Sequence, residues 1–132
     1  MPVTFEQVID SPWIKLSPIR VGKIPPGLGT PDVFVLAEDA DGTRIRVDVY
    51  SDGPEDYSCF REAILWHHWV VVGFGHKLHL VPIDQSPPIT IDFGSYFGYL
   101  YPTDDLLLVA TAEQLHSFCA KIGETTSHSK LV

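Results

Sequence analysis

Proline and glycine interrupt this sequence along its whole length. The 132 residues include 11 Pro and 10 Gly. Pro cannot donate a backbone hydrogen bond and Gly weakens the interior of a regular element, so long helices are interrupted almost everywhere. The length suits one domain, residues 1–132. We therefore predict a mainly β fold of about seven to nine short antiparallel strands, in a compact sheet, a sandwich or a partial propeller-like arrangement.

Three hairpins stand out in the hydrophobic pattern. The first pairs residues 33–37 with residues 44–50 across an Asp41-Gly42 turn, and its second strand alternates apolar and charged residues. Such alternation is typical of a half-buried strand. The other two hairpins run through residues 64–72 with 77–83, and through residues 106–110 with 115–118.

The segments outside the hairpins carry weaker signals. Five prolines between residues 11 and 31 predict an extended surface arm, with Trp13, Ile14 and Leu16 turned inward. Pro54 followed by acidic residues predicts one short helix near residues 55–63. The polar tail, residues 128–132, is expected to fray.

Charge and cysteine content limit the classes of partner. The chain has 9 basic and 17 acidic residues, a formal net charge of −8, which repels polyphosphates and anionic lipids. We expect neither nucleic-acid nor membrane binding. Cys59 and Cys119 show no disulfide-framework spacing, and no leader or membrane-spanning run is apparent. These features predict a soluble, cytoplasmic protein.

A weak internal repeat relates two parts of the chain. An offset of 37 residues superimposes Val72 on Val109, Leu78 on Leu115, and His79 on His116. With this pattern, residues 64–127 resemble the strand pairs of β-propeller blades of the quinoprotein or WD type. The resemblance implies blade-like antiparallel sheet. The sequence lacks the Trp-Asp dipeptide and the Gly-His signature, and two units cannot close a propeller.

An incomplete array of sheets leaves strand edges that must be covered. The proline-rich arm is a candidate cover for one edge. Self-association is a candidate cover for the other, so we expect a homo-oligomer.

Two aromatic segments are candidate ligand or interface sites. The first consists of Trp66, His67, His68 and Trp69, and the second contains Tyr96, Phe97, Tyr99 and Tyr101. Strand alternation turns one histidine of the first segment inward, where its ring needs a hydrogen-bond partner. Tyrosines combine apolar faces with a hydroxyl, which suits a pocket or an interface. The alternatives are a packing histidine and a loop that closes one end of the core.

Four potential metal ligands have a zinc-like spacing: His76, His79, His116 and Cys119. Residues three apart on a strand point to opposite faces, so each pair converges only if a turn or bulge intervenes. The alternative is that these are surface or sheet-face residues. We expect no cofactor.

No enzyme class finds positive support, because the chain lacks a nucleophile elbow, a dinucleotide fingerprint and a Walker motif. The leading hypothesis is a small non-enzymatic binding or assembly protein that self-associates through aromatic surfaces or open sheet edges. The alternative is a small-molecule-binding protein or an unmarked enzyme, with a pocket at residues 96–101 and a histidine from residues 66–69.

Overall fold

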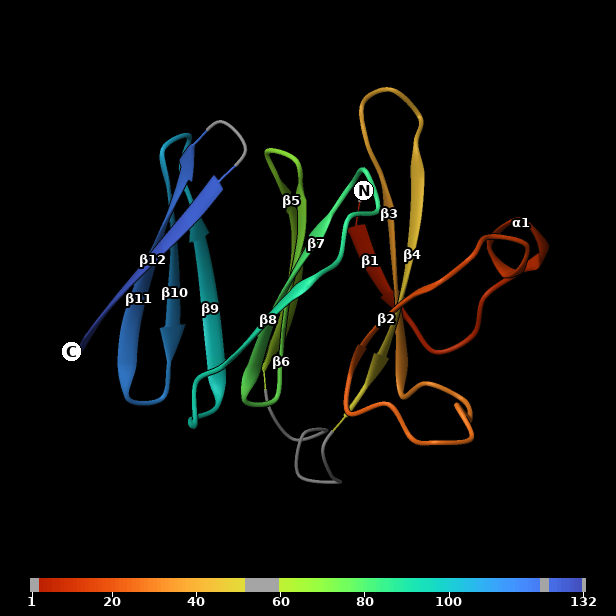
Figure 1. Ribbon diagram of the computed structural model, residues 1–132, viewed down its shortest axis with the longest axis horizontal. Helices are drawn as coiled ribbons and strands as arrows, with labels where there is room; N and C mark the ends of the chain where they lie inside the picture. The colour runs from red at the N-terminus through yellow and green to blue at the C-terminus, as the bar shows by residue number, and fades with distance from the viewer. Residues whose placement is uncertain (1–2, 52–59, 122–123, 132) are drawn as a thin grey trace.

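Three four-stranded sheets make up the protein (Figure 1). The computed structural model describes residues 3–51, 60–121 and 124–131. The sheets lie side by side in chain order, with sheet A on the right of Figure 1, sheet B in the middle and sheet C on the left. The predicted mainly β fold is confirmed, with twelve strands in the described residues instead of seven to nine.

Sheet A is formed by the first third of the chain. It contains β1 (Val3–Glu6), β2 (Ile19–Gly22), β3 (Val33–Glu38) and β4 (Arg44–Tyr50), in the order β1-β3-β4-β2. The β3–β4 pair is the first predicted hairpin. Strand β2, from the proline-rich arm, runs parallel to β4 at the sheet edge, where missing amide donors cost least.

Sheets B and C are antiparallel meanders that follow chain order. Sheet B contains β5 (Arg61–Trp66), β6 (Trp69–Phe74), β7 (Lys77–Pro82) and β8 (Ile89–Asp92). Sheet C contains β9 (Phe97–Pro102), β10 (Leu106–Thr111), β11 (Gln114–Lys121) and β12 (Glu124–Leu131). The two other predicted hairpins form as β6–β7 and β10–β11. Residues 64–72, expected as one strand, instead belong to β5 and β6, because a turn at residues 67–68 folds the run back on itself.

The 37-residue repeat is structural. Strand β10 begins and ends 37 residues after β6, since Leu106 follows Trp69 and Thr111 follows Phe74 at that offset. Within the hairpins, His79 pairs with Val72 and His116 pairs with Val109. Sheets B and C thus repeat one four-stranded antiparallel unit.

Two apolar layers hold the three sheets together. Between sheets A and B, Val35 and Val47 pack against Val70 and Val72. Between sheets B and C, a second layer contains Val71, Leu78, Leu80, Phe97, Leu100, Leu107, Val109 and Phe118. Successive residues of β6 alternate between the layers, so sheet B is buried on both faces.

A bulge and a glycine admit Phe97 to the layer between sheets B and C. Tyr99 pairs with Ala110 and Phe97 with Thr111, so Gly98 is an extra residue in β9. The bulge turns both Phe97 and Leu100 toward the core although they are three residues apart. A Cβ atom on Gly73 would lie 2.3 Å from Cε1 of the Phe97 ring.

We therefore predict that Gly73→Ala lowers the free energy of unfolding by about 1–3 kcal/mol, the usual cost of overpacking. The ring of Phe97 is 1% exposed, so a shift away from the new Cβ atom would disturb the packing around it. Chemical denaturation measures the change. Gly27→Ala is the matched control, because a Cβ there meets nothing within 4 Å. Equal stability of the Gly73 variant and wild type would contradict this packing.

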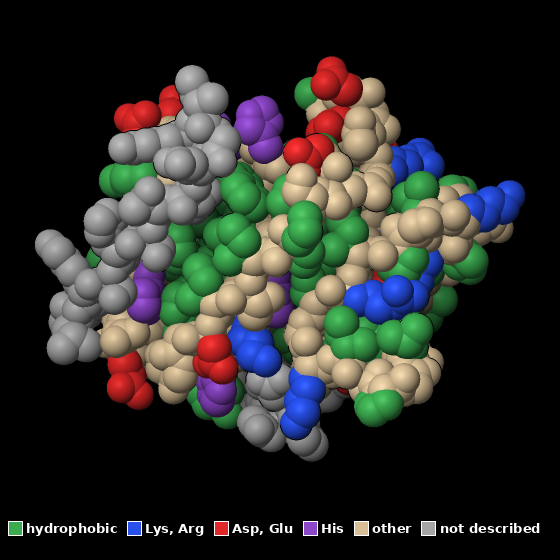
Figure 2. Space-filling model, in the orientation of Figure 1, with side chains coloured by type: hydrophobic (Ala, Val, Ile, Leu, Met, Phe, Trp, Pro, Cys, Tyr) green, Lys and Arg blue, Asp and Glu red, His purple; other side chains and the backbone are tan. Residues whose placement is uncertain are grey.

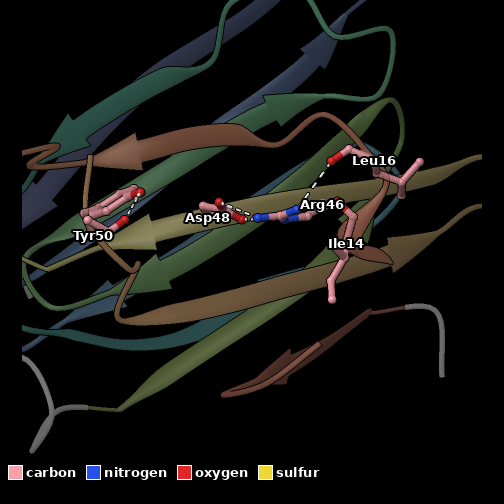
Figure 3. A network of polar contacts seen from close by, with 6 residues as sticks. Ile14, Leu16, Arg46, Asp48 and Tyr50 are labelled. Carbon is pink, nitrogen blue, oxygen red and sulfur yellow. Dashed lines mark hydrogen bonds and ion pairs between the residues drawn. The ribbon is translucent and has the colours of Figure 1, made fainter. Parts of the chain in front are cut away.

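The N-terminal arm covers the outer face of sheet A, the face turned away from sheet B (Figure 3). Arg46 forms an ion pair with Asp48, with Nε 2.9 Å from Oδ1, and donates from Nη1 to the carbonyl oxygens of Ile14 and Leu16. The Tyr50 hydroxyl donates to the carbonyl oxygen of Gly29 at 3.2 Å. These contacts fix the arm on the sheet.

The arm differs from the prediction in two respects. It contains a single helical turn, α1 (Ser11–Ile14), and the Ile14 side chain is 58% exposed instead of turned inward. The reason is that the backbone carbonyl of Ile14 faces the sheet to accept from Arg46. Trp13 and Leu16 are half-buried.

Two further expectations need correction. The predicted helix near residues 55–63 lies largely outside the described residues, and residues 61–63 belong to β5 because pairing with β6 overrides the local helix signal. The tail from residue 128, expected to fray, is paired as far as Leu131 with β11. Main-chain pairing with β11 forms a strand there although the sequence of the tail has no alternating apolar pattern.

Candidate functional site

The face of sheet C that points away from sheet B is a candidate binding surface. Along β10, Leu107 and Val109 enter the core, so Leu106, Leu108 and Ala110 point the other way. The register places their neighbours on the same face. We call this surface the front face: Tyr99, Tyr101, Leu106, Leu108, Ala110, Leu115, Ser117 and Cys119.

The front face is apolar, partly exposed and uncharged. Tyr99 is 51% exposed, Tyr101 52% and Leu106 37%, and the remaining members are half-buried. None of the eight side chains carries a formal charge at neutral pH, in a chain of net charge −8. Figure 2 does not look onto this face; in that view hydrophobic side chains gather over the middle of the molecule, and most Lys and Arg side chains lie to the right, on the side of sheet A.

The repeat relates the front face to an interface inside the protein. Leu108 and Leu115 lie 37 residues after Val71 and Leu78. Val71 and Leu78 are both 0% exposed, because sheet C packs on them. The front face therefore occupies the position at which sheet B receives its neighbour.

The two ends of the array differ. At the sheet A end, the arm leaves Phe34 and Leu36 only 8% exposed each. At the sheet C end, the equivalent layer of side chains remains accessible. Terminal units of repeat arrays normally carry a polar or covered outer face, so only the sheet A end is capped by the described residues.

An open hollow of about 440 Å³ adjoins the front face. Its lining consists of Phe60, Tyr96, Phe97, Gly98, Tyr99, Ala110, Thr111 and Ala112. The rings of Phe60 and Tyr99 stack with centroids 5.6 Å apart, and His76 lies against Tyr96 at 4.3 Å. The histidine at this hollow is thus His76, not one from residues 66–69.

The segment of residues 66–69 lies at the opposite end of β9 from the hollow. The Trp66 indole donates to the carbonyl oxygen of Thr103 at 2.8 Å, and the His67 ring contacts the carbonyl oxygen of Asp104. His67 and His68 form the turn between β5 and β6 and are both exposed, so the expectation that one of them points inward is wrong. Trp69 is half-buried against the layer between sheets B and C. These residues tie the β5–β6 turn to the β9–β10 turn, so the pocket hypothesis loses its proposed histidine.

The four candidate metal ligands are not brought together. His79 lies in the core with Nδ1 2.9 Å from the Thr90 hydroxyl, and His116 is buried against Phe93. Cys119 lies on the front face, the opposite side of β11 from His116. Within residues 3–51, 60–121 and 124–131, no three His, Cys, Asp or Glu side chains are placed to hold a metal ion.

His79 and His116 occupy equivalent positions but have different surroundings. The Nε2 atom of His116 is buried and has no hydrogen-bond partner among the described residues. Burial lowers the pKa of the His116 imidazole below its usual value, because desolvation disfavours the charged form.

We therefore predict that the protein loses stability as the pH falls below about 6.5, where the unfolded chain binds a proton that folded His116 resists. The stability is complete above that pH and declines toward the lower pKa of the folded state. Thermal unfolding across this range measures the effect, and His116→Leu should reduce the pH dependence. His68→Gln, at an exposed position, should leave it unchanged. An unaltered pH dependence in His116→Leu would contradict the assignment.

Sequence reasoning missed the aliphatic part of the front face. The run Leu106-Leu107-Leu108 predicts a hairpin strand, and three consecutive leucines on one strand also place apolar side chains on both faces. The 37-residue offset is a signal that could have identified this face, since it aligns Leu108 with Val71.

No protein-family model, curated protein sequence or solved structure matches this chain. Among the described helices, none has the length and apolar character needed to cross a bilayer.

Proposed function

We propose that this protein is a small binding and assembly protein that self-associates through the front face of sheet C. The observation that carries the proposal is the repeat equivalence: Leu108 and Leu115 occupy the positions that Val71 and Leu78 occupy under a packed sheet. Burial of such aliphatic and aromatic side chains contributes roughly 25 cal/mol per Å² of apolar area removed from water.

The composition of the front face supports a protein partner. Contiguous exposed apolar surface is typical of interaction sites, and tyrosines are enriched at interfaces because their rings bury a large area with little loss of conformational freedom. Its eight members include hydroxyl groups and a thiol but no carboxylate, amine or imidazole. The proposal therefore assigns binding, and no reaction, to this surface.

We expect Leu108→Glu to shift the protein toward a monomer, because association would bury an unpaired carboxylate at the centre of the face. Light scattering after size-exclusion chromatography, over a wide range of protein concentrations, measures the mass. Ile89→Glu is the matched control, since Ile89 is 45% exposed on the edge strand β8 of sheet B. Wild-type protein that stays monomeric throughout would overturn the proposal, as would equal masses for the two variants.

A second candidate function rests on the hollow beside Tyr96 and Tyr99. Its volume of about 440 Å³ lies within the range of small-molecule sites, and its lining is mostly aromatic and apolar. The stacked rings of Phe60 and Tyr99 favour a flat aromatic ligand. Thr111 and the two tyrosines of the lining carry hydroxyl groups that both donate and accept hydrogen bonds, and the His76 ring lies beside Tyr96.

If the hollow binds such ligands, a set of planar aromatic compounds should contain one that raises the melting temperature in proportion to occupancy. Tyr99→Ala should abolish that shift, while Tyr50→Phe, distant from the hollow, should retain it. Thermal-shift titration with each variant is the measurement. A set without any stabilising member would count against this second function for that ligand class.

A further inference from the structure

If the proposed self-association holds, the structure also indicates which surface of a second copy binds the front face. A second copy offers two sheet faces at the ends of its array: its own front face, or the outer face of sheet A. We infer that the front face binds the front face of a second copy, related by a two-fold axis, so that assembly stops at a dimer.

The arm opposes head-to-tail stacking on sheet A. The Arg46 and Asp48 side chains are only 14% and 3% exposed beneath the arm, and Arg46 also bonds to the carbonyl oxygens of Ile14 and Leu16. Displacing the arm would break these charge-assisted contacts and leave a desolvated ion pair under an incoming apolar sheet. The outer face of sheet A is therefore closed to the front face of another copy.

The charge distribution favours front-to-front contact between copies. Two chains of net charge −8 repel each other, so they approach best through a surface on which neither copy places a charge. The eight front-face side chains of β9, β10 and β11 meet that condition, and the charged residues that the register adds to this face, Lys121, Glu124 and Lys130, lie at its β11–β12 margin. The existing A–B and B–C layers also show that aliphatic sheet faces of this chain pack on one another.

Two-fold symmetry has a geometric consequence for Leu108. This residue lies in the interior of β10, between Tyr101 on β9 and Ser117 on β11. An axis through the centre of the face places Leu108 beside the same residue of the second copy. An isologous contact uses one surface on both partners and closes on itself, so no free front face remains for a third copy.

The size of the sheet sets the expected strength. The three strands that carry the front face, about 4.8 Å apart and six residues long at about 3.3 Å per residue, give a flat area of roughly 300 Å² per copy. A stable standard interface buries about 800 Å² per partner. We therefore expect a dimer that dissociates on dilution.

Charge complementation tests the symmetry. Leu108→Glu and Leu108→Lys are purified separately, and each should be monomeric because like charges meet at the axis. An equimolar mixture should restore the dimer mass, since glutamate then faces lysine. The same pair of substitutions at Tyr101 serves as a second position, in case the axis passes closer to β9. Circular dichroism confirms that each variant is folded, and Leu108→Glu mixed with wild type is the control for mixing alone.

The outcomes separate the two proposals. Wild-type protein that is monomeric at every concentration overturns the proposed self-association itself. Wild-type protein that associates, but whose charged variants are rescued at neither position, retains self-association and overturns the front-to-front dimer. A wild-type mass above that of two copies also overturns the front-to-front dimer. The front-to-front contact closes on itself, and only a head-to-tail contact can add further copies. Rescue in the mixtures, with a limiting mass of two copies, supports the inference.

Discussion

The burial of sheet B on both faces is the constraint on which the rest of the structure depends. Val70 and Val72 pack toward sheet A and Val71 packs toward sheet C, so three consecutive valines of β6 belong to two different layers. A strand in this position cannot shift its register by one residue without exchanging the two layers. Sheets A and C are consequently placed by their contacts with one central sheet.

The sequence predicted the parts of the fold in which the local pattern and the tertiary packing agree. The hairpins β3–β4, β6–β7 and β10–β11 combine apolar runs with turn residues, and they form as expected. The strands that no specific pattern predicted, such as β9 and β12, lie at sheet edges. An edge strand is selected by main-chain pairing with an existing sheet, which composition barely records.

The sequence predicted only part of the candidate site. The aromatic residues Tyr99 and Tyr101 could be identified from their type, and they do lie on an exposed surface. The aliphatic Leu108 and Leu115 could not be distinguished from core residues, because a leucine at an interaction surface has the same side chain as a leucine in the core. Only the position of sheet C at the end of the array makes them accessible.

The extra residue at Gly98 decides which chemistry the protein presents to its surroundings. Upstream of the bulge Phe97 points inward, and downstream Leu100 points inward, so Tyr99 and Tyr101 are directed outward. A regular β9 strand of the same length without the bulge, with Phe97 still anchored beneath Gly73, would turn both tyrosines into the core and Leu100 to the surface. Loss of the bulge without loss of a residue would therefore exchange an aromatic surface for an aliphatic one, whereas deletion of Gly98 would keep the tyrosines outward. The bulge and its extra residue must therefore be gained or lost together if the surface is to be preserved.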